Sequence, residues 1–163
     1  MSGEVDAFIG LGSNLDDREG QLEAAIREIA ALPATTLVAR SSLYESAPLG
    51  ADGGDYLNAV ARVRTSLAPA GLLGALQAIE AHHGRERPYA NAPRRLDLDL
   101  LLHGEARLQT AGLTLPHPRL HERAFVLLPL AEIAPGLRIP GRGRVPDLLR
   151  DLGPQRVARF ARP

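Results

Sequence analysis

The run Arg94-Arg95-Leu96-Asp97-Leu98-Asp99-Leu100-Leu101-Leu102 has leucine at alternate positions from Leu96 onward, which predicts a β-strand with one buried face. Side chains on a strand point alternately to its two faces, so the even-numbered leucines, Leu102 included, should share one face. Asp97 and Asp99 should then lie side by side on the other face, together with Arg95. We predict that this strand covers residues 96–103 and turns at Gly104.

The segments before this strand predict a β-α-β-β-α-β order. Apolar or β-branched runs predict strands over residues 5–10, 36–44 and 56–65. The glycine-rich run 10–14 is interpreted as a tight turn from the first strand into a helix. The predicted order is the ferredoxin-like arrangement, an α+β fold in which both helices cover one face of an antiparallel sheet.

Two helices are predicted between these strands. Apolar residues at helical spacing predict a first helix that is capped by Asn14 or Asp16 and ends at Pro33. The second should be capped by Ser66 and end near Gly84. Toward the C-terminus we expect a helix over 125–134 and a short helical turn over 146–152, whereas residues 155–160 favour neither state. Without a repeat or a linker, residues 1–163 are predicted to form a single domain.

Composition excludes several kinds of chemistry. All 19 basic side chains are arginines, because the chain has no lysine, and it has no cysteine. A P-loop lysine, a Schiff base, a thiolate nucleophile and a cysteine-bound metal are therefore excluded. The absence of cysteine fits a reducing compartment, and no signal peptide or apolar span is recognisable, so we expect a cytoplasmic protein that is not bound to a membrane.

The balanced net charge hides an asymmetry along the chain. Residues 1–84 carry five arginines against eleven acidic side chains, and residues 85–163 carry fourteen against eight. This distribution favours a basic surface in the second half, unless folding mixes the two halves.

Asp97 and Asp99 are the strongest candidates for a functional site. Two carboxylates about 7 Å apart on one strand face repel each other unless a cation lies between them. Mg²⁺ suits such a pair, since it binds one or two carboxylates and completes its shell with water and phosphate. The alternative is a solvated strand face that pairs with Arg95. Arg85, Arg87 and Arg94 precede the aspartates and favour polyphosphate transfer, because arginine neutralises phosphate charge.

Other candidates lie further away in the chain. His117, between two prolines, is the histidine most suited to a functional role. Tyr56 and Asn58 should share a strand face, which suits a flat ligand with a polar edge, although a half-buried strand would explain the pair almost as well. Gln77 and Glu80 share one helix face, which could equally be a solvated one.

Several motifs together closely resemble one known family. They are Gly12-Ser13-Asn14-Leu15, Pro48-Leu49-Gly50, Asp55-Tyr56-Leu57-Asn58, Ile79-Glu80, Gly84-Arg85-Glu86-Arg87, Pro93-Arg94-Arg95-Leu96-Asp97-Leu98-Asp99 and Pro116-His117 to Arg123-Ala124-Phe125. In this order they resemble the 6-hydroxymethyl-7,8-dihydropterin pyrophosphokinases of folate biosynthesis. The resemblance implies transfer of pyrophosphate from ATP to the pterin hydroxymethyl group, with release of AMP. It also implies αβα layers, with further strands and helices after the ferredoxin-like core.

The resemblance also implies a role for individual residues. Asp97 and Asp99 would hold two Mg²⁺ ions on the triphosphate, and Arg85 and Arg94 would steady the phosphates during transfer. The positions that match the nucleotide site are Gln77, Glu80, Arg87, Arg94, Leu100, Thr114, His117 and Arg123. The positions that match the pterin site are Ser46, Ala47, Leu49, Tyr56, Asn58 and Phe125. Asn91, Gly112 and Pro118 depart from the residues often found in the family, which affects the expected lid and ribose contacts and not the metal site.

Two other functions fit parts of the sequence. A β-α-β-β-α-β sheet with a basic second half also occurs in RNA-recognition domains, but those need exposed aromatic residues and a basic surface. The chain has six aromatic residues and no net charge, so we expect no nucleic-acid partner. A γ-phosphoryl kinase or a nucleotidyltransferase would differ in the product that it forms from ATP. We expect ATP and 6-hydroxymethyl-7,8-dihydropterin as substrates, and a monomer.

Overall fold

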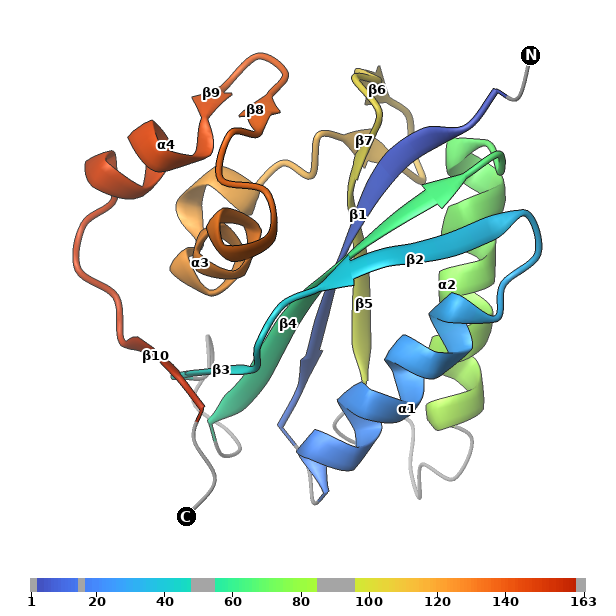
Figure 1. The fold of residues 1–163 in the computed structure, drawn as a ribbon, viewed down its shortest axis with the longest axis horizontal. Helices are drawn as coiled ribbons and strands as arrows, with labels where there is room; N and C mark the ends of the chain where they lie inside the picture. The colour runs from blue at the N-terminus through green and yellow to red at the C-terminus, as the bar shows by residue number, and fades with distance from the viewer. Residues whose placement is uncertain (1–2, 15–16, 48–54, 85–95, 161–163) are drawn as a thin grey trace.

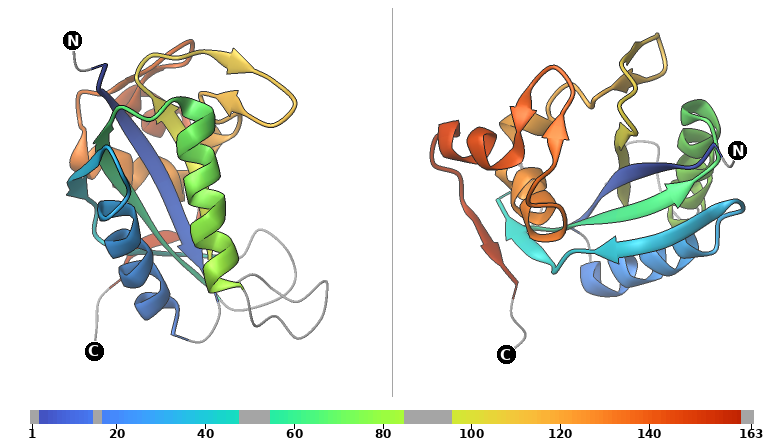
Figure 2. Two further views of the ribbon diagram at one scale, coloured as in Figure 1. Left: turned by 90° about the vertical axis from the view of Figure 1, so that its right-hand side faces the viewer. Right: turned by 45° about the horizontal axis from the view of Figure 1, so that its top comes forward.

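The protein is described by a computed structural model that covers residues 3–14, 17–47, 55–84 and 96–160. Figure 1 shows a sheet with helices on both of its sides. The helices are α1 (Arg18–Ala30), α2 (Pro69–His83), α3 (Ala124–Ile133) and α4 (Val145–Asp151), with a 3₁₀ turn η1 at Leu120–Glu122. In the left view of Figure 2, α1 and α2 lie in front of the strands and α3 and α4 lie behind them. The layers are therefore αβα, as expected.

The central sheet is antiparallel throughout its described pairs. Its strands are β1 (Val5–Ser13), β2 (Thr35–Arg40), β3 (Tyr44–Ser46), β4 (Tyr56–Thr65), β5 (Asp97–His103) and β10 (Val157–Arg159). They are ordered β10-β3-β4-β1-β5, and β2 pairs with β4 along the same edge as β3. Two small hairpins lie outside the sheet, β6 (Leu108–Gln109) with β7 (Thr114–Leu115) and β8 (Arg138–Ile139) with β9 (Gly143–Arg144). The β-α-β-β-α-β core and the α+β class are confirmed.

Each face of the sheet carries its own apolar core. Leu57, Ala61 and Val63 of β4 pack with α1 and α2, because odd-numbered residues of β4 point to that side. Val60 points to the opposite side, where it packs with Phe8 and with the apolar face of α3. The even-numbered residues of β4, Tyr56 and Asn58 among them, therefore belong to the face that carries α3.

The prediction for β5 is correct at its start and wrong at Leu102. Leu96, Leu98 and Leu100 are buried on the α1–α2 side, but Leu101 and Leu102 both pack in the α3 core. The pairing of β1 with β5 shifts by one residue between Phe8 and Ile9, so the alternation reverses there. Asp97 and Asp99 precede this bulge and share the α3 side with Gly12 and Gly10, as the alternation predicts.

Other predictions needed correction at element ends. The prediction of a turn over residues 10–14 is wrong for residues 10–13, because β1 continues through Gly10 and Gly12 to Ser13. Asp17, whose backbone is in the left-handed conformation, caps α1 with its side chain in place of Asn14. Asp16 lies outside the described residues. Ser66 does not cap α2, which begins after Ala68 without a side-chain cap.

Other elements agree with the sequence or refine it. The single strand predicted over 36–44 is two strands, β2 and β3, separated where the Ser41 hydroxyl accepts a hydrogen bond from the backbone N–H of Val60. The helix predicted over 125–134 is α3, with Pro129 inside it, and the turn predicted over 146–152 is α4. Among the described residues, no helix combines the length and the apolar character needed to cross a membrane.

Candidate active site

Three residues form a row across β4, β1 and β5 on the side of the sheet that carries α3, near the end of β1. Gly12 of β1 lies opposite Asn58 of β4 on one side and opposite Asp97 of β5 on the other. One step along β1, Gly10 lies opposite Asp99. Residues directly opposite in antiparallel ladders point to the same face. The two carboxylates therefore face the amide of Asn58 across a strand that has no side chain at these positions.

Glycine keeps this part of the sheet open. A Cβ atom at Gly12 would lie 3.3 Å from Oδ1 of Asn58 and 3.6 Å from Cδ1 of Tyr56. A Cβ at Gly10 would lie 3.4 Å from the side chain of Leu101. A larger residue at either position would fill the space between the carboxylates and the polar side chains of β4. Sequence reasoning missed this role, although glycine at alternate positions beside two aspartates on the next strand is a visible signal.

Asp97 and Asp99 fit a hard divalent cation. Their carboxylate oxygens are the donor type that Mg²⁺ prefers, and they lie two residues apart on one face of β5. The Asp99 side chain is 48% exposed, so it can reach a metal shared with a ligand that binds from solution. Gly10 and Gly12 leave room above the strand beside them. The donor set and the space above the two glycines therefore fit a divalent cation that also binds a ligand from solution.

His117 lies beside this pair with its ring orientation fixed. Its backbone N–H donates to the Leu101 carbonyl, 2.9 Å away, which attaches the segment to β5. The backbone N–H of Arg119 donates to Nδ1 of His117 at 3.2 Å. A neutral ring must therefore carry its proton on Nε2, the nitrogen that lies 4.0 Å from Oδ1 of Asp99.

The charge state of His117 follows from its surroundings. Burial lowers the pKa of His117, the Asp99 carboxylate opposes that shift, and the guanidiniums of Arg123 and Arg119 reinforce it. The ring is therefore neutral at neutral pH and offers the Nε2–H group as a hydrogen-bond donor next to the aspartates.

The side chain of Asn58 presents a hydrogen-bond acceptor toward the open space above Gly12. Its Nδ2 donates to Oγ of Ser46 at 2.7 Å and to the Tyr44 carbonyl at 3.3 Å. A carbonyl can only accept, so the amide nitrogen must face Tyr44 and the amide oxygen must face Gly12. The hydrogen bonds to β3 thus orient the buried Asn58, and its amide oxygen can accept hydrogen bonds from N–H groups along the edge of a ligand.

Tyr56 connects this acceptor with the carboxylates. It precedes Asn58 by two residues and lies on the same face of β4. Burial raises the pKa of Tyr56, and the negative charge of Asp97 raises it further. The Tyr56 ring also lies 3.6 Å from the Cβ position of Gly12, the residue opposite Asp97, so a ring placed against Tyr56 would lie next to the two carboxylates.

Arg123 and Phe125 lie together at the start of α3. The Cζ atom of Arg123, at the N-cap of α3, lies 5.5 Å from the centre of the Phe125 ring. The same guanidinium influences the pKa of His117. The residues that the sequence assigned to the pterin and to the nucleotide therefore meet at the start of α3.

The other predicted nucleotide residues have different environments. Glu80 accepts a hydrogen bond from the backbone N–H of Leu98 at 2.8 Å, so it holds β5 between the two aspartates. Leu100 points into the core beneath α1 and α2 and is 3% exposed, which leaves only its backbone for a ligand. Gln77 is exposed on α2.

Two of the predicted pterin residues, Ser46 and Ala47, lie at the end of β3. Leu49, Arg85, Arg87, Asn91 and Arg94 lie outside the described residues.

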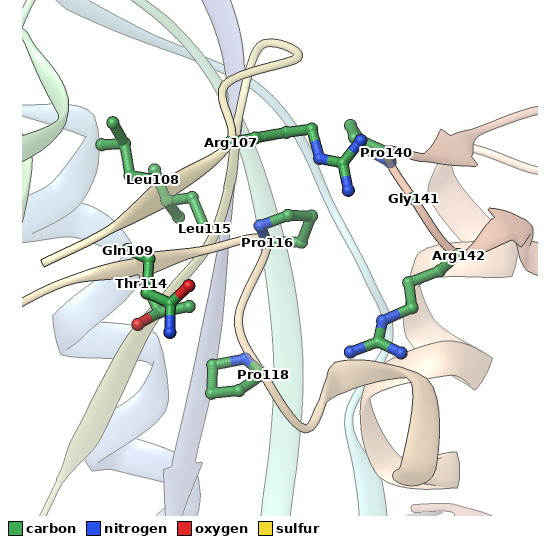
Figure 3. Close-up of a pocket in the computed structure, with 10 residues that line it drawn as sticks. All are labelled: Arg107, Leu108, Gln109, Thr114, Leu115, Pro116, Pro118, Pro140, Gly141 and Arg142. Atoms are coloured by element: carbon green, nitrogen blue, oxygen red, sulfur yellow. The ribbon is translucent and has the colours of Figure 1, made fainter.

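Thr114 lines a pocket of about 580 Å³ between the β6–β7 and β8–β9 hairpins. Figure 3 shows Gln109 and Thr114 on one side of it and Arg142 on the other. Arg107 lies along its rim and packs over Gly141, where a Cβ would meet the guanidinium at 2.7 Å. This pocket offers two guanidiniums beside Thr114, and sequence reasoning assigned neither of them.

Comparison with known proteins gives consistent matches. The family described as 7,8-dihydro-6-hydroxymethylpterin-pyrophosphokinase matches residues 8–135. A Pseudomonas aeruginosa protein named 2-amino-4-hydroxy-6-hydroxymethyldihydropteridine pyrophosphokinase is 50% identical over 143 residues, covering 87% of this chain and 88% of its own. A Haemophilus influenzae protein of the same name is 43% identical over 157 residues, covering 96% and 98%.

Solved structures match the fold. The crystal structure of wild-type Plasmodium falciparum HPPK-DHPS with pterin and p-hydroxybenzoate has a TM-score of 0.71 at 13% identity and covers 90% of this chain. The structure of the same wild-type protein with pteroate gives a TM-score of 0.72, also at 13% identity. This chain spans 43% and 42% of the length of those two chains. At this identity they support the architecture alone.

Proposed function

The chain belongs to the 7,8-dihydro-6-hydroxymethylpterin-pyrophosphokinase family, and we propose that its reaction takes place on the sheet face around Asn58, Gly12 and Asp97. It is an ATP-dependent diphosphotransferase of folate biosynthesis. It transfers a pyrophosphoryl group from ATP to the hydroxymethyl group of 6-hydroxymethyl-7,8-dihydropterin, and AMP is the other product.

The observation that carries the assignment is the position of the Tyr56 ring beside Gly12, the residue that lies opposite Asp97 in the ladder of β1 with β5. A pterin is a flat ring with N–H donors along one edge. Tyr56 and Phe125 provide aromatic surfaces for its faces, and Oδ1 of Asn58 accepts from its edge. With the ring between Tyr56 and Phe125, the hydroxymethyl group extends toward Asp97, where the phosphates are held. In this proposal Ser46 and Ala47, at the end of β3, contribute backbone or side-chain contacts, and Leu49 is assigned to the pterin as well.

Asp97 and Asp99 hold Mg²⁺ on the triphosphate, and we assign two ions to the pair. When bound, Mg²⁺ neutralises phosphate charge and lowers the pKa of a hydroxyl that it binds. The carboxylates fix its position on β5, which Glu80 holds in place through the N–H of Leu98. No separate strong base is then needed to remove the hydroxyl proton.

The remaining nucleotide contacts come from the side of α3 and the hairpins. His117 donates from Nε2 and Arg123 adds a permanent positive charge, which suits the phosphates. Thr114 marks the nucleoside end, beside the pocket that holds Arg107 and Arg142. Gln77 and the backbone of Leu100 take part from α2 and β5. Arg85 and Arg94 steady the transferred and leaving phosphates, and Arg87 contacts the nucleotide.

Analysis of the nucleotide product tests this function directly. Protein is incubated with Mg²⁺, ATP and 6-hydroxymethyl-7,8-dihydropterin, and the nucleotides are separated by chromatography. AMP should appear in proportion to the pterin consumed. ADP as the product would indicate an ordinary kinase, and pyrophosphate release with a pterin–AMP adduct would indicate a nucleotidyltransferase. AMP at the level of a pterin-free control would refute the assignment.

We further propose that residues 1–163 act as one domain, as a monomer, in the cytoplasm. The shared αβα core and the bacterial relatives that match over nearly their whole length support this proposal. Light scattering at working concentrations should give the mass of one chain, and fractionation of the cells should recover the protein with the cytoplasmic enzymes.

A further inference from the structure

Three metal-ligand atoms come together between α1 and α2, on the opposite side of the sheet from Asp97 and Asp99. They belong to Glu28 of α1 and to His82 and His83 in the last turn of α2. Nδ1 of His82 lies 3.0 Å from Oε1 of Glu28, and Nε2 of His83 is hydrogen-bonded to the other carboxylate oxygen. One atom from each residue lies within 4.8 Å of the other two.

The orientation of His83 is fixed by a fourth residue. Nδ1 of His83 faces Oε1 of Gln21, one turn from the start of α1. A ring that donates Nδ1–H to this amide oxygen directs the lone pair of Nε2 toward Glu28. Metal-binding histidines characteristically donate their second ring nitrogen to such an acceptor, which sets the tautomer. Gln21 therefore holds His83 in the state in which Nε2 can bind a metal.

A positive charge between Glu28, His82 and His83 would stabilise their arrangement. The Glu28 carboxylate can only accept hydrogen bonds, yet an imidazole nitrogen faces each of its oxygens. Without a cation, both rings must direct a proton at the same carboxylate. One divalent ion would satisfy all three ligands with neutral rings.

We propose that Glu28, His82 and His83 bind a divalent transition-metal ion of the zinc type. Two imidazoles and a carboxylate are a ligand set for Zn²⁺, Co²⁺ or Ni²⁺, whereas Mg²⁺ takes oxygen ligands. Zn–N bonds of about 2.1 Å place tetrahedral donor atoms about 3.4 Å apart, within the spread found in this cluster. The His82 side chain is 64% exposed, so water can fill the fourth position. The bound ion joins α1 to α2.

Metal titration of protein without an affinity tag tests the proposal. The protein is freed of metal, supplied with excess Mg²⁺ to occupy the aspartates, and titrated with Zn²⁺ against a coloured chelator. We expect one tight equivalent in the wild type. Glu28→Gln and His82→Gln should each weaken it at least tenfold, about 1.4 kcal/mol. Co²⁺ in the wild type should give the intense visible bands of a four-coordinate ion.

The control variant is His121→Gln, which removes an imidazole from η1 and should bind Zn²⁺ like the wild type. Circular dichroism and thermal unfolding verify that each variant is folded, and exposed His82 is preferred to His83 for that reason. Zn²⁺ should raise the melting temperature of the wild type and not that of His82→Gln. The proposal is overturned if folded Glu28→Gln and His82→Gln retain the wild-type affinity, or if the wild type binds no tight equivalent. The cluster is then an ion-pair contact between the helices.

Discussion

Gly12 lies directly opposite Asp97 in the antiparallel ladder of β1 with β5. A side chain at Gly12 would enter the space in which the proposed pterin and phosphate sites meet, since Oδ1 of Asn58 is only 3.3 Å from the Cβ position. The pairing explains why a glycine stands near the end of β1, between β4 and β5, where it offers no packing of its own. The backbone of β1 thereby serves as the floor of the site.

We therefore expect Gly12→Ala to affect the pterin more than the nucleotide. The added methyl group displaces Asn58 or the ring against Tyr56, so KM for the pterin should rise about tenfold, equivalent to ~1.4 kcal/mol. KM for ATP should change less, because most of the proposed nucleotide contacts lie on other elements, at α2, at β7 and at the start of α3. Initial rates at varied pterin and at varied ATP separate the two effects. An equal rise in both constants would contradict this placement of the pterin.

Asp97→Asn and Asp99→Asn should each reduce kcat/KM by at least about a hundredfold. The amide keeps the shape of the side chain and removes the charge that would hold Mg²⁺ in the proposed site. Unfolding temperature should not fall, because the replacement also removes repulsion between two carboxylates on one strand face. AMP formation and thermal unfolding are measured on the same preparations, with Asp147→Asn on exposed α4 as the control. If either variant is folded and fully active, that residue is not a metal ligand.

Local patterns in the sequence predicted most of the core elements. Alternating leucines identified β5, and helical spacing identified α1, because each pattern reflects burial on a single face. The end of β5 was not predictable in this way, since the bulge beside Phe8 depends on how β1 pairs with it. Asp17 caps α1 from a left-handed conformation, which no residue pattern nearby indicates.

The sequence predicted which residues of the candidate site share a strand face, but not which strands bring them together. Alternation placed Asp97 with Asp99, and Tyr56 with Asn58, on common faces. Their proximity depends on the strand order β4-β1-β5, which brings the two pairs to either side of β1. Glycine in Gly10–Gly12 suggested a turn because glycine is common in turns, but pairing on both sides keeps β1 extended there.

A stability test is available on α2. Gly74 lies in the middle of this helix, and a Cβ there would meet nothing within 4 Å. Gly74→Ala should stabilise the fold by about 0.5–1 kcal/mol, because alanine restricts the unfolded chain and favours the helix. The contrasting variant is Gly104→Ala, where φ is +56° and the substitution should destabilise. Urea unfolding of both variants measures the effects, and opposite signs are expected. Activity of Gly74→Ala should equal that of the wild type.

The pH dependence of the free energy of unfolding should show that His117 is neutral in the folded protein. Burial lowers the pKa of His117 below its ordinary value of 6.5, against the opposing charge of Asp99, so the unfolded chain binds this proton more readily than the folded one. The contribution to stability is complete above the unfolded pKa and is lost as pH falls through the window down to the lowered folded pKa. The free energy of unfolding of the wild type, minus that of His117→Gln, should therefore decrease from about pH 8 to about pH 5. Urea titrations across this range measure the difference, and His121→Gln controls for removing an imidazole from a neighbouring segment. A difference that stays level or grows on acidification would mean that His117 is protonated as easily in the folded protein as in the unfolded chain, and that its surroundings do not favour the neutral ring.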